Sequence, residues 1–192
     1  MTRVQIMTML TQHIKDGIFV ELGTDGGAFS EEILAANPTC TLYCIDPYTS
    51  YQDYNDSINQ KTGDHLYKET KKRLTSLFGE RVKFIRQFSD QVDLNSLPDF
   101  DYVYIDANHA FKYVLSDLKR YFPKLKPGRV CQLDDVCDTS GSRDINGNIH
   151  VKWGPNCEGQ YGVFHALNTF CTKKSLFFTM APAVNQAFIT KL

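Results

Sequence analysis

Short apolar runs that are typical of buried strands alternate along this chain with segments of helical periodicity. This alternation predicts a mostly parallel sheet whose strands are joined by crossover helices. We expect strands at 18–22, 41–45, 82–86, 101–105 and 129–133, and a closing pair at 176–180 and 187–190. Helices are expected at 3–15, 30–36, 64–78, 110–122 and 161–170. The prediction is a single domain over residues 1–192: an α/β, Rossmann-like, doubly wound sheet with an antiparallel C-terminal strand, in three α/β/α layers.

The composition of the chain restricts the kinds of molecule that the protein is expected to bind. The formal net charge of −1 gives no general attraction to nucleic acid or to anionic membranes. No apolar stretch approaches the roughly 20 residues needed to span a bilayer, and the N-terminus lacks the apolar region of a signal peptide. The six cysteines form no CxxC pair, which favours reduced thiols. We therefore expect a cytoplasmic protein that binds neither nucleic acid nor membrane.

Two long polar segments interrupt the pattern, at residues 47–64 and 136–160. The second is rich in Gly, Asn, Asp and Ser. Loops of this length in a compact domain are usually functional or disordered. We expect 136–160 to be an active-site loop, in which His150 and Trp153 are candidate pocket residues.

The first candidate site lies directly after the first expected strand. Gly23 and Gly27 form a GxxxG turn, in which glycine permits tight turning and close approach to a ligand. Glu21 stands among apolar neighbours, where a carboxylate is costly unless a cation or a hydrogen-bond donor meets it. A sulfonium or ammonium ligand would provide that partner. The alternative is a salt bridge to a nearby lysine.

A second carboxylate, Asp46, ends the second expected strand, 23 residues after Gly23. At this distance a carboxylate can accept hydrogen bonds from both ribose hydroxyls of an adenosine. The alternative is a turn or helix-capping aspartate before Pro47.

Three more carboxylates end the fourth and fifth expected strands: Asp106, Asp134 and Asp135. Carboxylates that meet at one sheet edge repel one another unless a cation lies among them, and Mg²⁺ prefers such oxygen ligands. The alternative is that Asp134 caps the following loop while Asp106 orients Asn108. His109 is a candidate general base, with adenine orientation or helix capping as alternatives.

Six segments, taken in order, carry a family resemblance: VELGTDGGAFS, CIDPY, IRQFSD, DYVYIDANHAFKYVLSDLKRYFPKLKPG, QLDD and YGVFHALNTF. From about Phe19 to Phe170 the chain resembles class I S-adenosylmethionine-dependent methyltransferases. More closely, it is similar to the group related to macrocin O-methyltransferase and cephalosporin-pathway methyltransferases. It departs from that group at Gln87, at Arg129 and at Gln132–Leu133, where glycine is usual.

The resemblance implies a role for each candidate residue. Glu21, Gly23 and Gly27 would hold the methionine part of S-adenosylmethionine, Asp46 the ribose, and Ser89 and Asp90 would lie near the adenine. The full predicted cofactor set is Glu21, Gly23, Thr24, Gly27, Ser30, Asp46, Ser89, Asp90 and Asp106. The predicted catalytic residues are His109 and Asp106, and the predicted Mg²⁺ ligands are Asp106, Asp134 and Asp135.

The expected function is Mg²⁺-assisted methyl transfer to a hydroxyl oxygen of a small molecule, sugar or glycoside. Three alternatives stay open: a nicotinamide-dependent oxidoreductase, a catalytically silent cofactor-binding protein, and metal-independent transfer with His109 alone as base. A homo-oligomer is compatible with the sequence, which does not fix the oligomeric state.

Overall fold

The structure of the chain is a computed structural model that describes residues 1–50, 60–136 and 162–192. Its helices are α1 (Arg3–Thr11), α2 (Ala28–Ala36), α3 (Gln60–Phe78), α4 (Phe111–Tyr121) and α5 (Val163–Lys174). Its strands are β1 (Ile18–Leu22), β2 (Thr41–Ile45), β3 (Val82–Ile85), β4 (Phe100–Ile105), β5 (Leu125–Leu133), β6 (Phe178–Ala181) and β7 (Gln186–Thr190). Short 3-10 turns connect several of them, including η2 (Ser89–Gln91) after β3.

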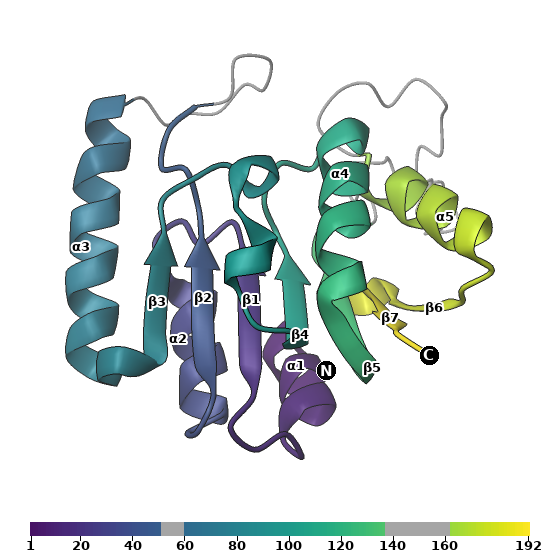
Figure 1. Cartoon of the computed structure of the whole chain (residues 1–192), viewed down its shortest axis with the longest axis horizontal. Helices are drawn as coiled ribbons and strands as arrows, with labels where there is room; N and C mark the ends of the chain where they lie inside the picture. The colour runs from purple at the N-terminus through teal and green to yellow at the C-terminus, as the bar shows by residue number, and fades with distance from the viewer. Residues whose placement is uncertain (51–59, 137–161) are drawn as a thin grey trace, which may run out of the picture.

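The strands form one sheet in the order β3-β2-β1-β4-β5-β7-β6 (Figure 1). Neighbouring strands from β3 to β5 are parallel, and β7 runs antiparallel between β5 and β6. The chain moves outward from β1 on one side to β2 and β3, and then returns to build β4 and β5 on the other. This confirms the predicted doubly wound, mostly parallel sheet, with a topological switch point between β1 and β4.

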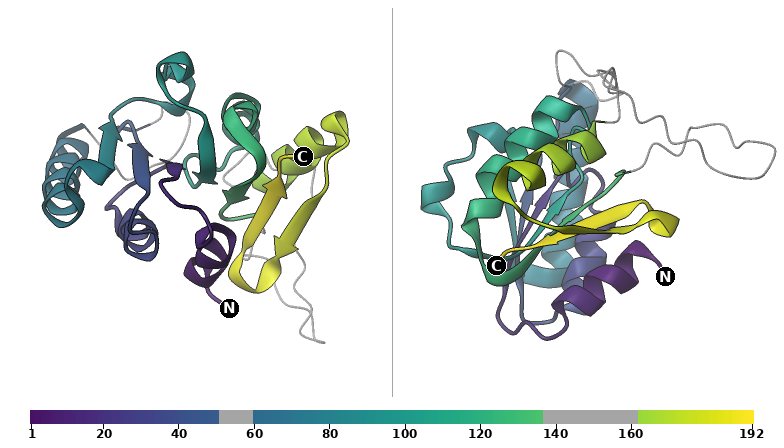
Figure 2. Two further views of the ribbon diagram at one scale, coloured as in Figure 1. Left: turned by 60° about the horizontal axis from the view of Figure 1, so that its bottom comes forward. Right: turned by 90° about the vertical axis from the view of Figure 1, so that its right-hand side faces the viewer.

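Helices cover both faces of the sheet, as the turned views show (Figure 2). Alternate residues of the strands pack in two separate cores, because successive side chains of a strand point to opposite faces of the sheet. Val20 and Val103 pack in the core under α4 and α5, to which α4 contributes Leu118. Phe19 packs in the opposite core with Ile33 of α2. The central strands are therefore buried on both faces, as their apolar sequences require.

The expected boundaries are accurate for the central strands and differ by several residues at four places, one of which is α5, which ends at Lys174 and not at the predicted residue 170. Strands β1 and β2 have the predicted bounds, whereas α1 ends at Thr11, before the predicted residue 15, and α3 begins at Gln60, before the predicted residue 64. Strand β5 begins at Leu125, before the expected residue 129, because Leu125 already pairs with Phe100 ahead of an irregularity in the ladder. The turn predicted at Lys126–Gly128 lies inside this strand.

The segment predicted as an active-site loop lies almost wholly outside the described residues, together with His150 and Trp153. Their roles stay predictions. Within the described ranges, no helix combines the length and the apolar character that crossing a bilayer requires.

Candidate functional site

Four candidate residues form one row across the carboxyl end of the sheet. Gly23, Asp46, Asp106 and Asp134 each follow directly on the last residue of β1, β2, β4 and β5. The backbone N–H of each donates to the carbonyl of the final residue of a neighbouring strand, over 2.8–3.2 Å. The parallel register therefore brings to one sheet edge groups that are far apart in the sequence, and in open α/β sheets this is the edge where ligands bind.

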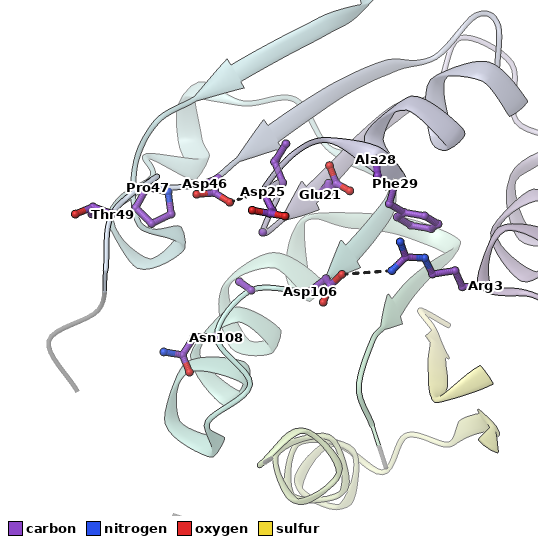
Figure 3. Close-up of a pocket in the computed structure, with 13 residues that line it drawn as sticks. Arg3, Glu21, Asp25, Ala28, Phe29, Asp46, Pro47, Thr49, Asp106 and Asn108 are labelled. Atoms are coloured by element: carbon purple, nitrogen blue, oxygen red, sulfur yellow. Dashed lines mark hydrogen bonds and ion pairs between the residues drawn. The ribbon is translucent and has the colours of Figure 1, made fainter. Parts of the chain in front are cut away.

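A pocket of about 380 Å³ opens at this row (Figure 3). This volume lies within the range of small-molecule sites. Of the predicted cofactor residues, it is lined by Glu21, Gly23, Thr24, Asp46 and Asp106. Also lining it are Arg3, Asp25, Ala28, Phe29, Pro47, Thr49, Ala107 and Asn108, which were not among the predicted ligands.

The glycine turn brings β1 and β4 into close contact. Gly23 has a φ of +86°, and a Cβ atom at this position would overlap with the backbone carbonyl oxygen of Asp106. Gly27 does not line this pocket, and its predicted approach to a ligand stays a prediction. A Cβ there would meet the side chains of Leu74 and Thr70 of α3, at 2.8 Å each. The second glycine of GxxxG thus allows α3 to pack on the start of α2.

Asp46 is held by the backbone on both sides. Its Oδ1 accepts a hydrogen bond from the N–H of Tyr48 at 2.7 Å, and its Oδ2 accepts one from the N–H of Asp25 at 2.9 Å. The first bond is the turn contact considered as an alternative, and the second ties Asp46 to the glycine turn. Each carboxylate oxygen can accept a further bond, so the structural role leaves room for a ligand.

Glu21 is buried at the floor of the pocket and accepts a hydrogen bond from Ser30 of α2. Burial raises the pKa of Glu21 to about 8. No ion pair between Glu21 and a lysine or arginine forms within the described part of the chain, so the salt-bridge alternative is not supported there. Ser30 is itself fully buried and orients Glu21 from behind.

At the ends of β4 and β5 the predicted carboxylates lie close to the side chains of His109 and Arg3. Nε2 of His109 lies 3.3 Å from Oδ1 of Asp106, and its Nδ1 lies 3.6 Å from Oδ2 of Asp135. Burial lowers the pKa of His109, but the hydrogen bond to Asp106 and the surrounding carboxylates outweigh this and raise it above the ordinary 6.5. Arg3, from the first turn of α1, lies 3.1 Å from Asp134 and 3.8 Å from Asp106.

The predicted Mg²⁺ site is not supported by this arrangement. Asp134 receives four donors: Arg3 and the hydroxyl of Tyr104 on Oδ2, and the amide of Gln186 and the N–H of Asp135 on Oδ1. Four donors match the roughly four acceptor positions of a carboxylate. Across residues 1–50, 60–136 and 162–192, no three His, Cys, Asp or Glu side chains are placed to hold a metal ion.

Two residues predicted near the adenine do not line the pocket. Ser89 lies in η2 and donates to the buried Asp117 at 2.5 Å, while Asp90 is exposed. Their predicted place near the adenine stays a prediction.

Solved structures share this fold at low sequence identity. A Staphylococcus aureus protein with the provisional description caffeoyl-CoA O-methyltransferase has a TM-score of 0.69 at 16% identity, over 97% of this chain and 81% of that one. A TDP-rhamnose 3′-O-methyltransferase of calicheamicin biosynthesis has a TM-score of 0.64 at 14% identity, over 97% and 78%. A Clostridium thermocellum protein provisionally described as an rRNA methylase has 0.65 at 11%, over 98% and 95%. These likenesses show the fold: a Rossmann-like sheet that this chain shares with proteins described as methyltransferases.

The family follows from the sequence. Residues 20–136 match the family model described as a methyltransferase domain. This match spans more than half of the chain, which therefore belongs to this family, within the class I S-adenosylmethionine-dependent methyltransferases. Among curated proteins, none matches the sequence.

Proposed function

We propose that this protein binds S-adenosylmethionine in the pocket at the carboxyl ends of β1, β2 and β4 and transfers its methyl group to an oxygen of an acceptor. The observation that carries the proposal is the row of Gly23, Asp46 and Asp106, which lines one pocket of suitable volume. Asp46 would accept from the ribose hydroxyls, since its carboxylate is held in place by the turn. Asp106 and Glu21 would face the charged methionine part.

Two observations on the pocket residues fit this ligand. The amide nitrogen of Asn108 is buried and finds no hydrogen-bond acceptor among the described residues. A buried donor without a partner is costly, and a bound ligand with acceptor atoms would satisfy it. Glu21 is a buried carboxyl group without an ion-pair partner in the same ranges, and the positive charge of the ligand would stabilise its ionised form.

When bound, S-adenosylmethionine supplies an electrophilic methyl group, which leaves its sulfur and forms a bond to the acceptor oxygen. The protein would align acceptor and donor, which can contribute roughly 7–11 kcal/mol in favourable cases. His109 would take the acceptor's hydroxyl proton on Nδ1, because its Nε2 is hydrogen-bonded to Asp106. The carboxylates of Asp106 and Asp135 on either side of the ring would stabilise the resulting imidazolium.

A small hydroxylated molecule, sugar or glycoside is the proposed acceptor class. The near-neutral net charge argues against a phosphate backbone, and one protein of similar fold is described as acting on a TDP-sugar. Another is described as an rRNA methylase, so the fold is compatible with both kinds of acceptor. Methylation assays with sugar nucleotides, glycosides and structured RNA, read by formation of S-adenosylhomocysteine, would separate them.

Titration calorimetry with S-adenosylhomocysteine and with NAD tests the cofactor directly. We expect binding of the first and not of the second. Asp46→Ala should weaken S-adenosylhomocysteine binding by roughly tenfold or more, because hydrogen bonds to a charged group contribute about 1.5–3 kcal/mol. The matched control is Asp16→Ala, an exposed aspartate that precedes β1, at the opposite end of the sheet.

Tight binding of NAD, or equal affinity of the Asp46→Ala and Asp16→Ala proteins for S-adenosylhomocysteine, would refute the assignment. Binding of S-adenosylhomocysteine with no methyl transfer to any acceptor class would favour the silent cofactor-binding protein.

His109→Gln tests the proposed base. Loss of a general base costs roughly 10²–10⁴-fold in rate, while affinity for S-adenosylhomocysteine should stay unchanged because His109 does not line the cofactor pocket. The measurement is single-turnover methyl transfer to the acceptor identified above. An unchanged rate would remove His109 from the mechanism.

A further inference from the structure

The cation that faces the carboxylates at the ends of β4 and β5 is a side chain of this protein. Nη1 of Arg3 lies 3.1 Å from Oδ2 of Asp134 and 3.8 Å from Oδ2 of Asp106. Carboxylates gathered at one edge need a positive charge among them, and this guanidinium supplies it. In Figure 3, Arg3 and Asp106 lie at the end of the pocket away from Asp46 and Thr49.

Arg3 is held in this place by contacts on several sides. It is the first residue of α1, whose start is fixed by Thr2 in a capping box with Gln5. Its guanidinium stacks on the ring of Phe29, 4.7 Å from the ring centroid. Phe29 in turn packs on Tyr104 at 4.3 Å, and the Tyr104 hydroxyl donates to the same oxygen of Asp134 as Arg3 does.

Asp134 is also fixed from the opposite side, by a chain of buried amides. The hydroxyl of Tyr102 donates to Gln132 at 2.8 Å, and Gln132 donates to Gln186 at 2.8 Å. Gln186 then donates to Oδ1 of Asp134. Gln132 therefore acts through Gln186, which occupies an oxygen of the carboxylate that a metal ion would have to bind.

We propose that Arg3 takes the place of a metal ion in this protein: it is a positioning residue that holds Asp106 and Asp134 together and excludes divalent cations from the strand ends. Guanidinium is charged at every accessible pH and forms several directed hydrogen bonds, so it can neutralise both carboxylates. Unlike a metal ion, it offers no open coordination position to an acceptor oxygen. Activation of the acceptor then depends on a protein base. The catalytic part of this proposal rests on the proposed methyl transfer, whereas the exclusion of metal does not.

Electron paramagnetic resonance with Mn²⁺ alone tests the exclusion, because free Mn²⁺ gives a signal that binding removes. We expect the wild-type protein to leave the signal of millimolar Mn²⁺ unchanged. Arg3→Met removes the charge and keeps a long apolar stem on Phe29, and it should bind Mn²⁺ at least roughly tenfold more tightly than wild type. Arg3→Lys keeps a cation and should behave as wild type does.

Two results would overturn the proposal. One is stoichiometric Mn²⁺ binding by the wild-type protein that Asp106→Asn abolishes. The other is an Arg3→Met protein that is folded by circular dichroism and binds no more Mn²⁺ than wild type. If the Arg3→Met protein does not fold, the measurement of Mn²⁺ binding by the wild-type protein still tests the proposal.

Calorimetry with S-adenosylhomocysteine, with and without excess chelator, separates this proposal from the proposed function. Equal binding of S-adenosylhomocysteine with and without chelator agrees with both the proposed function and the exclusion of metal. Absence of binding in both conditions refutes the proposed function and leaves the Mn²⁺ result to decide the role of Arg3. Binding that chelator abolishes refutes the exclusion of metal.

Discussion

Glu21 shows how one buried side chain links folding to ligand binding. It is 1% exposed, and burial raises its pKa to about 8, against the hydrogen bond from Ser30 that lowers it. We therefore expect the free protein to retain a proton on Glu21 at neutral pH. A positively charged ligand at the pocket would favour the ionised form, so the residue suits a cationic cofactor and is costly without one.

A stability difference that depends on pH follows for Glu21→Gln. The pKa is higher in the folded than in the unfolded chain, so the stability contributed by the proton is fully present below the unfolded value of 4.5 and is lost as pH rises through about 8. The glutamine variant mimics the protonated form. Its unfolding free energy should exceed that of wild type increasingly from about pH 5 to pH 8, by an amount on the order of several kcal/mol at the upper end.

Urea unfolding at a series of pH values measures this difference. Other buried carboxyls also make the unfolding free energy depend on pH, and they are unchanged in the variant. One of them is Asp117, whose pKa burial raises to about 7. The quantity to follow is therefore the difference between the two proteins. Parallel curves would show that Glu21 is ionised in the free protein.

Among the elements, the turn between β1 and α2 decides how closely the central strands approach at the site. Only a residue without a Cβ fits at Gly23, because the backbone carbonyl of Asp106 occupies that space. A Cβ atom at the neighbouring Gly26 would have no other atom within 4 Å, and the φ of Gly26 lies outside the left-handed region. A Cβ atom is therefore excluded at Gly23 and tolerated at Gly26, in the same turn.

Gly23→Ala and Gly26→Ala form a matched pair for this turn. A Cβ at Gly23 adds a left-handed strain of about 1–3 kcal/mol to the backbone clash, so we expect a loss of at least about 2 kcal/mol in unfolding free energy. Gly26→Ala should change it by no more than about 0.5 kcal/mol. Denaturant titration of both proteins checks this, and equal stabilities would mean that the β1 and β4 ends lie further apart than described.

For the whole molecule, one sheet joins two cores, so that neither face can unfold without exposing the central strands. We expect a single cooperative thermal transition that a bound ligand shifts upward. S-adenosylhomocysteine at a hundredfold excess over its Kd stabilises by about 2.7 kcal/mol, which for a chain of this length corresponds to a Tm increase of roughly 5–10 °C. Differential scanning fluorimetry measures the shift.

The Asp46→Ala protein at the same ligand concentration is the control, and its Tm should rise much less than that of wild type. If Arg3 takes the place of a metal ion, excess chelator should leave the Tm shift of the wild-type protein unchanged. A Tm that rises with NAD and not with S-adenosylhomocysteine would point to the oxidoreductase.

Local pattern was enough to predict most of the fold and the row of groups at the sheet edge. Apolar runs bounded by glycine and aspartate gave the bounds of β1 and β2, and helical segments between them gave a parallel sheet. Since parallel strands end at one edge, Gly23, Asp46, Asp106 and Asp134 had to meet there. This step requires only that the strands are parallel and that each of these residues follows directly on the end of a strand.

Contacts between distant side chains required the folded structure. Arg3 and Asp134 are separated by 131 positions, and nothing near Arg3 in the sequence distinguishes it from any other helix-start cation. Its place depends on how α1 packs against Phe29 and Tyr104, just as the hydrogen bond of Ser89 to Asp117 depends on the path of the loop after β3. A hydrogen bond or ion pair is decided by positions within an ångström or so, and only the packing of whole elements sets those positions.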